Sequence, residues 1–120
     1  MNKKIINVIF FIALLMTSHK AMSYVVTVYN ETDRSIRLDA KLAATNEIRN
    51  VAVEPHKSGE INSAGWCIDW IMGTLIAYGD KVAYTTNAIQ GPSTGFGISC
   101  RNFDVHVKPT ANNQIVLDAR

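Results

Sequence analysis

The sequence predicts an all-β fold: a small, single-domain antiparallel β-sandwich of about seven to nine short strands, stapled by one disulfide. Three observations lead to this fold class. Short segments of alternating apolar and polar residues follow one another, separated by turn-forming residues at intervals of about eight to twelve residues. No long segment after the N-terminal leader has the 3.6-residue period of a helix. The chain has two cysteines, and its leader predicts an oxidising destination for them.

Residues 1–23 have the organisation of a secretory signal peptide, and its start is typical of bacterial leaders. Lys3 and Lys4 precede the apolar run Ile5–Met16, and small residues follow at Ala21 and Ser23. The apolar run is shorter than the roughly 20 residues that a membrane-spanning helix needs, so we expect cleavage before Tyr24 rather than an uncleaved anchor. The sequence therefore predicts a domain over residues 24–120 in a secreted or periplasmic protein, which meets the membrane only through its cleaved signal.

The charge of the expected mature domain excludes one class of partner. The chain has 12 Lys and Arg against 10 Asp and Glu, but Lys3, Lys4 and Lys20 leave with the leader, so 12 − 3 = 9 basic residues face 10 acidic ones. The domain has no cluster of basic residues. We therefore expect no nucleic-acid partner.

Two segments show the alternation of a half-buried strand most clearly. In 35–42 the apolar positions are Ile36, Leu38, Ala40 and Leu42. The segment 103–108 alternates in the same way. The first strand, at 24–29, is expected to form a hairpin with 35–42. The further strands predicted by composition are 48–53, 60–62, 66–72, 75–78, 81–86, 98–100 and 114–118.

The segment from Trp66 to Cys100 forms the middle of the predicted domain. Cys67 and Cys100 are the only cysteines, so we expect them to pair and to brace a domain that is too small for a large core. Within 66–72, a regular strand places Trp66, Ile68 and Trp70 on one face. A short helix from about residue 63 is the alternative, because a short apolar run cannot be assigned by its period alone. Residues 87–97 are expected to be the longest irregular stretch.

Aromatic residues are the best binding candidates in the sequence. Trp66 and Trp70 are predicted to share a face, and Tyr78 is close to them in sequence. Such residues form platforms for glycans or protein partners, but in a small domain they also fill the core. Phe96 lies between two glycines in the longest loop, where it could contact a ligand or fold back to plug the sandwich.

Only one pair of residues indicates chemistry. Asp104 and His106 fall on the same polar strand face, so the carboxylate could orient the imidazole. The alternative is an exposed charge pair with little effect. The sequence has no hydrolase, zinc-protease or phosphate-loop motif, and we expect neither a metal nor a cofactor. The sequence matches an N-glycosylation acceptor at Asn30-Glu31-Thr32.

These observations favour an exported, non-catalytic binding module for an unknown protein or glycan. The main alternative is a structural or toxin-like exported protein that assembles with itself or acts on membranes. A small hydrolase that uses Asp104 and His106 is a third possibility.

Overall fold

The computed structural model describes residues 23–77 and 83–120, so most of the predicted signal peptide lies outside the described residues. The described chain is all-β and has no helix. Its eight strands are β1 (Val25–Asn30), β2 (Ile36–Leu42), β3 (Ile48–Val53), β4 (Ser58–Asn62), β5 (Ile68–Leu75), β6 (Tyr84–Thr85), β7 (Phe103–Pro109) and β8 (Ile115–Ala119).

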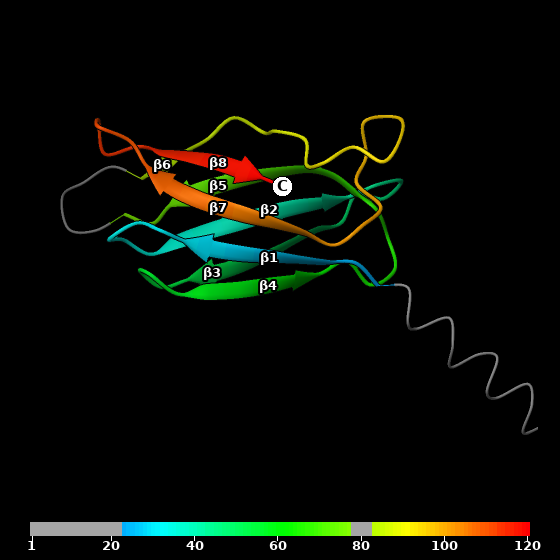
Figure 1. Ribbon diagram of the computed structural model, residues 1–120, viewed down its shortest axis with the longest axis horizontal. Coiled ribbons are helices and arrows are strands. Elements are labelled where there is room, and N and C mark those ends of the chain that lie inside the picture. Colours follow the sequence, from blue (N-terminus) through cyan, green and yellow to red (C-terminus); the bar gives the residue numbers. More distant parts are fainter. Residues whose placement is uncertain (1–22, 78–82) are drawn as a thin grey trace, which may run out of the picture.

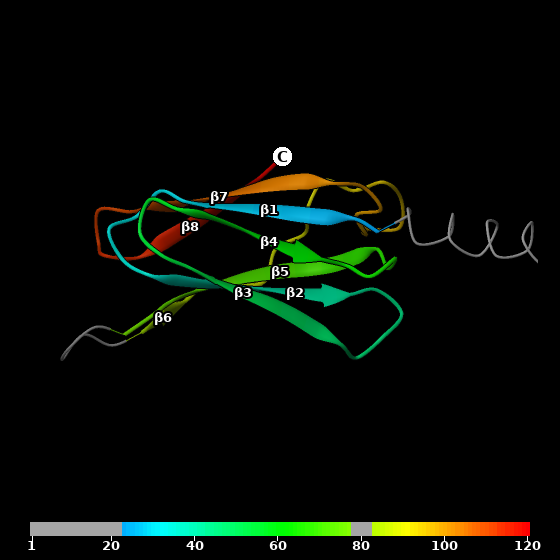
Figure 2. The same ribbon diagram turned by 90° about the horizontal axis from the view of Figure 1, so that it is seen from below.

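The strands form two four-stranded sheets that pack face to face, which confirms the predicted sandwich (Figures 1 and 2). Sheet A has the order β4-β1-β7-β8, and sheet B has the order β3-β2-β5-β6. All pairs of neighbouring strands are antiparallel except β1 and β7, which run parallel. Sheet A is therefore mixed, although the sequence predicts antiparallel pairing throughout.

The predicted hairpin between the first two strands is wrong. β1 belongs to sheet A and β2 to sheet B, so the loop between them crosses from one layer to the other. Each strand has one apolar face that packs against the opposite sheet. The alternation of apolar and polar residues is the same whether two such strands pair within one sheet or lie in opposite sheets. The pattern therefore defines the buried face of each strand but does not define its partner.

The predicted inward faces of two strands are confirmed. In β2 the side chains of Ile36, Leu38, Ala40 and Leu42 are 0% exposed. The alternate residues of β7 are buried in the same way, beginning with Phe103. Together they build one core between the sheets, whose remaining buried apolar members are Val26, Val28, Val53, Ile61, Ile68, Ile71, Leu75 and Ile115.

A β-bulge changes the faces of β5. Ile68 pairs with Leu42 and Trp70 pairs with Lys41, so Asp69 is an additional residue with no counterpart in β2. The bulge shifts the alternation, which leaves Ile68 and Ile71 both in the core while Trp70 faces outward. The prediction that Trp66, Ile68 and Trp70 share a face is therefore wrong. Trp66 also precedes the strand, which begins at Ile68.

β5 continues through Gly73, where the sequence suggests a break. A Cβ atom at Gly73 would lie 3.0 Å from Leu117 Cδ2 and 3.3 Å from Ile115 Cδ1, so the glycine lets the side chains of β8 approach the opposite sheet closely. The sequence also predicts a hairpin in which 75–78 and 81–86 flank a Gly79-Asp80 turn, and β5 and β6 do pair antiparallel, with Thr74 opposite Thr85. The Gly79-Asp80 turn itself lies outside the described residues.

Candidate functional site

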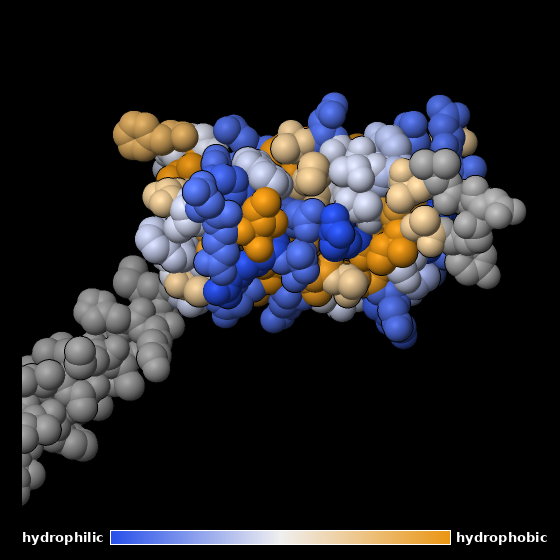
Figure 3. All heavy atoms as spheres, turned by 180° about the vertical axis from the view of Figure 1, so that it is seen from behind, coloured by the Kyte–Doolittle hydropathy of each residue, from blue (hydrophilic) through white to orange (hydrophobic). Residues whose placement is uncertain are grey.

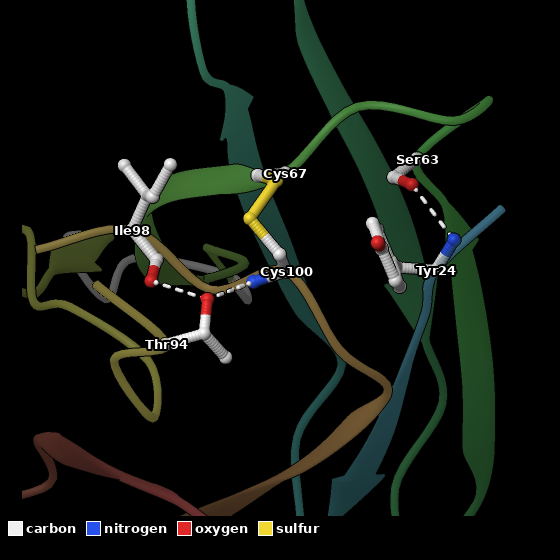
Figure 4. The surroundings of a disulfide bond; sticks show 6 residues. All are labelled: Tyr24, Ser63, Cys67, Thr94, Ile98 and Cys100. Atoms are coloured by element: carbon white, nitrogen blue, oxygen red, sulfur yellow. Dashed lines mark hydrogen bonds between the residues drawn. A yellow bond between two sulfur atoms is a disulfide. The ribbon is translucent and has the colours of Figure 1, made fainter. Parts of the chain in front are cut away.

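The predicted disulfide between Cys67 and Cys100 is present and closes a sequence separation of 33 (Figure 4). Next to it, Ile68 and Ser99 exchange two backbone hydrogen bonds, each with an N···O distance of 2.8 Å. The disulfide and these bonds hold the end of the long irregular segment against the start of β5. The segment that follows residue 93 is therefore anchored to the sandwich at its base.

Residues 94–98 form a small hairpin above this anchor. The amide of Ile98 donates to the Gly95 carbonyl oxygen over 3.1 Å, and the Thr94 amide donates to the Ile98 carbonyl oxygen over 2.8 Å. The hydroxyl oxygen of Thr94 accepts a hydrogen bond from the Cys100 amide at 2.9 Å, which ties the hairpin to the disulfide (Figure 4). This hairpin, which we call the Phe96 loop, is thus held on both sides of its tip.

Phe96 occupies the first of the two central positions of this turn. Phe96 has a φ of 54° and Gly97 a φ of 74°. Two central residues with positive φ are typical of the type I′ turn, where asparagine, aspartate or glycine normally come first. A bulky side chain is rare there, because its Cβ crowds the following carbonyl group in the left-handed conformation. The backbone therefore holds Phe96 in a strained conformation.

The ring of Phe96 is 104% exposed, so it makes no contact that compensates for this strain. The alternative in which Phe96 folds back and plugs the sandwich is thus wrong. Gly97 cannot be replaced freely either, because its φ of 74° is strained for any residue that carries a Cβ. The sequence signal for this geometry is the dipeptide Phe-Gly, an X-Gly pair at a two-residue loop. The sequence analysis missed Thr94, whose role depends on a contact six residues away.

Trp66 lies at the same end of the sandwich as the Phe96 loop, in the connection from β4 to β5 (Figure 1). Its side chain is 45% exposed, and its amide donates to the Ser63 carbonyl oxygen over 3.1 Å. Trp66 is therefore part of the surface and does not fill the core. The structure brings the connection that carries Trp66 to the end of the molecule that presents Phe96 (Figure 1).

Trp70 is half-buried on the outer face of sheet B, beside Lys41. Lys41 forms an ion pair with Asp69 at 3.2 Å, so charged groups flank the indole. Seen from the side of sheet B, hydrophobic and hydrophilic residues are interspersed over this face (Figure 3). Trp70 thus lies on a strand of sheet B, whereas Trp66 lies in the connection before that strand. Tyr78 lies outside the described residues.

Asp104 and His106 both face outward from β7, as predicted. His106 Nδ1, however, lies 3.2 Å from Glu31 Oε2, and its ring stacks on Tyr29 with centroids 4.8 Å apart. Within the described residues, no hydrogen bond joins Asp104 to His106, and no group of three His, Cys, Asp or Glu residues could hold a metal ion. The partners of the imidazole are thus Glu31 and Tyr29, which the sequence analysis missed.

One carboxyl group on the outer face of sheet A has a shifted pKa. Hydrogen bonds from Arg120 and then Lys108 lower the pKa of Asp118 from 3.8 to about 2. The carboxylate lies 2.7 Å from the Arg120 guanidinium and 3.2 Å from the Lys108 amine. Both partners are exposed, so these pairs contribute little to stability and keep Asp118 ionised.

Comparison with known proteins leaves the function open. No protein-family model and no curated protein matches the chain. The chain is similar to a protein from Eubacterium rectale whose structure was determined by NMR, with 13% sequence identity and a TM-score of 0.49. The similarity covers 81% of this chain and 87% of that one. The part of the chain that the structure describes contains no helix that is long and apolar enough to cross a membrane.

Proposed function

We propose that this chain is an exported, non-catalytic binding module that uses Phe96 as its principal anchor, and that its ligand is a protein with an apolar recess. The single observation that carries this proposal is the fully exposed phenyl ring at a positive φ, on a loop tied down by Thr94 and the disulfide. Strained residues persist where the surroundings hold them, and they cluster at functional sites.

The rigidity of the Phe96 loop supports a role in binding. Ordering a flexible loop on association costs free energy, and a loop that is already held in place avoids much of that cost. The turn at Gly95–Ile98 closes the tip, and the disulfide holds the base. An aromatic side chain presented in this way can enter a pocket with little further ordering, which is how anchors at protein interfaces act.

A protein ligand suits this geometry better than a glycan. A ring that projects from a loop tip can be surrounded by a partner, whereas a sugar is normally stacked on a flat aromatic face that lies in a shallow surface. Trp66 is a second exposed aromatic, and the connection from β4 to β5 that carries it lies at the same end of the sandwich as the Phe96 loop (Figure 1). The predicted leader and the disulfide support the exported location in this proposal, because disulfides are typical of oxidising compartments.

Site-specific photocrosslinking in the producing cells tests the proposal. A benzophenone amino acid is placed at position 96 and, as a matched control, at Val116, another exposed apolar position, which lies on β8. We expect a discrete protein adduct at position 96 that is absent at position 116. The purified partner should then bind the Phe96→Ala variant about tenfold or more weakly, which is about 1.4 kcal/mol.

Other outcomes identify the alternatives. An adduct between two copies of this chain, with a concentration-dependent dimer that Phe96→Ala abolishes, would favour the self-assembling structural protein. Labelling of lipid alone would favour the membrane-active one. Equal labelling at positions 96 and 116, or a partner that binds Phe96→Ala as tightly as the unchanged protein, would contradict the proposal.

A further inference from the structure

A second surface has the features of a small ligand site. It lies where β1 ends, at the opposite end of the sandwich from the Phe96 loop (Figure 1). An open hollow of about 590 Å³ lies where β1 ends and β4 begins. This volume falls within the range of ligand sites, which is about 300–1,000 Å³. We call it the Tyr29 hollow, and it is lined by Tyr29, Asn30, Glu31, His56, Lys57 and Ser58.

The register of sheet A places an aromatic face at the wall of the Tyr29 hollow. Ser58 of β4, Tyr29 of β1 and His106 of β7 lie in one row across three neighbouring strands. Residues directly opposite in neighbouring strands have side chains on the same face of a sheet. His106 stacks on one side of the Tyr29 ring, with an interplanar angle of 18°. Ser58, which lies on the side of Tyr29 opposite His106, lines the hollow, and His106 does not.

The loops that form the hollow are held rigidly by Asn30, which is only 2% exposed. Its side-chain nitrogen donates to the carbonyl oxygens of Arg34 at 2.7 Å, Val53 at 3.0 Å and Glu54 at 3.1 Å. Its side-chain oxygen accepts hydrogen bonds from the amide and the hydroxyl of Thr32. This buried amide therefore joins the loop after β1 to the loop after β3. The Asn30 side-chain nitrogen is occupied by these hydrogen bonds, so it is not available for attachment of a glycan. The Asn30-Glu31-Thr32 motif therefore stabilises the fold.

Two further contacts orient the polar groups around the hollow. His56, which has a φ of 58°, places its Nε2 atom 2.7 Å from Asp33 Oδ1 and so links the two loops a second time. Glu31 is held by its contact with His106 Nδ1. The Glu31 carboxylate is an acceptor, the Lys57 ammonium a donor, and the Ser58 hydroxyl can do either.

We propose that the Tyr29 hollow binds a neutral sugar residue, with its C–H face stacked on the free side of the Tyr29 ring. The ring supplies an apolar face, and the surrounding groups supply both donors and acceptors for hydroxyl groups. Of the two basic side chains that line the hollow, Lys57 is balanced by Glu31 and His56 contacts the Asp33 carboxylate, which argues against a charged ligand. This inference goes beyond the protein-binding role of Phe96 and does not depend on it.

Titration of the disulfide-bonded, isotope-labelled domain followed by amide NMR tests the inference. The probes are maltotriose, chitotriose, cellotriose and xylotriose at millimolar concentrations, with adenosine as an aromatic ligand for comparison. We expect at least one trisaccharide to cause saturable shifts at Tyr29, Glu31 and Ser58. Tyr29→Ala should weaken that response about tenfold, whereas Tyr29→Phe should keep it within about threefold, because the ring face remains.

Two further variants keep the test decisive. Val116→Ala is the matched control, because Val116 is an exposed residue on the same sheet, and it should leave the response unchanged. If Tyr29→Ala does not fold, Lys57→Met removes a donor from an exposed side chain and should weaken binding severalfold. The inference is overturned if no trisaccharide gives saturable shifts, if Tyr29→Phe and Tyr29→Ala are equally weak, if the shifts cluster at the Phe96 loop, or if adenosine binds and every sugar fails.

Discussion

Replacing Phe96 by asparagine should make the domain more stable, although it removes a large apolar side chain. The ring is 104% exposed, so its removal returns no buried area to water and loses no transfer free energy. The φ of 54° is retained in the turn, and asparagine populates this region several times more often than bulky residues do. A bulky residue in the left-handed region costs about 1–2 kcal/mol, and Phe96→Asn should recover about 1 kcal/mol of it.

Two companion variants separate strain from the loss of the ring. Phe96→Ala keeps a Cβ at the same φ, so the free energy of unfolding should stay within about 0.5 kcal/mol. Phe96→Gly removes the strain but gives the unfolded chain more freedom, which offsets about 0.5–1 kcal/mol of the gain. Gly97→Ala is the control in the opposite direction. It adds a Cβ at a φ of 74°, and it should destabilise by about 1–2 kcal/mol.

Thermal and urea unfolding of the four variants provide the measurement. For a domain of this size, 1 kcal/mol corresponds to about 4–8 °C, so Phe96→Asn should melt higher than the unchanged protein by a readily measured amount. A fall of several degrees for both Phe96→Asn and Phe96→Ala would refute the reasoning, because it would mean that the ring is packed against the sandwich. A stabilised Phe96→Asn that no longer binds the crosslinked partner would instead link the strain to function.

Other regions of the domain can be tested in the same way. Replacing Cys67 and Cys100 together by alanine should lower the free energy of unfolding by about 3–4 kcal/mol in urea titrations, and equal stability of the two proteins would contradict a bracing role. Asn30→Asp should destabilise by about 2–4 kcal/mol despite its similar shape, because a carboxylate cannot donate to the three carbonyl groups; an unchanged urea midpoint would argue against the buried network. The lowered pKa of Asp118 means that its carboxylate adds a little stability above about pH 4 that is lost as the pH falls toward 2, so Asp118→Asn should slightly reduce the fall of the urea midpoint across that window, and a steeper fall would contradict this. The intact mass of exported protein should place the first residue at Tyr24, and a product that keeps residues 1–23 would disprove cleavage.

The sequence alone determined several features of the domain, because each depends on residues that are close in the chain or few in number. Alternation identified the buried faces of β2 and β7. Two cysteines permit only one internal pair, so the disulfide followed from their number and from the leader. The glycines on both sides of Phe96 indicated a loop in which an aromatic residue could be exposed.

Pairing between strands was decided only by the tertiary structure. β1 pairs with β4 and β7 and not with its neighbour β2, and β7 lies more than 70 residues further along the chain. The bulge at Asp69 depends on which residues of β2 lie opposite, and it alone turns Trp70 away from the core. The period of a strand gives its two faces, but its register with a distant strand depends on the packing of the whole core.

The two candidate sites differ in how far the sequence could predict them. The Phe96 loop is local: five consecutive residues and the adjacent disulfide build it, so its position was visible in the sequence. The Tyr29 hollow joins residues from β1 and β4 with two loops, and no local pattern contains them all. Periodicity predicts the face of the strand on which a side chain such as that of His106 lies. The contacts of that side chain can be predicted only once its cross-strand neighbour is known, because the folded sheets bring the two residues together.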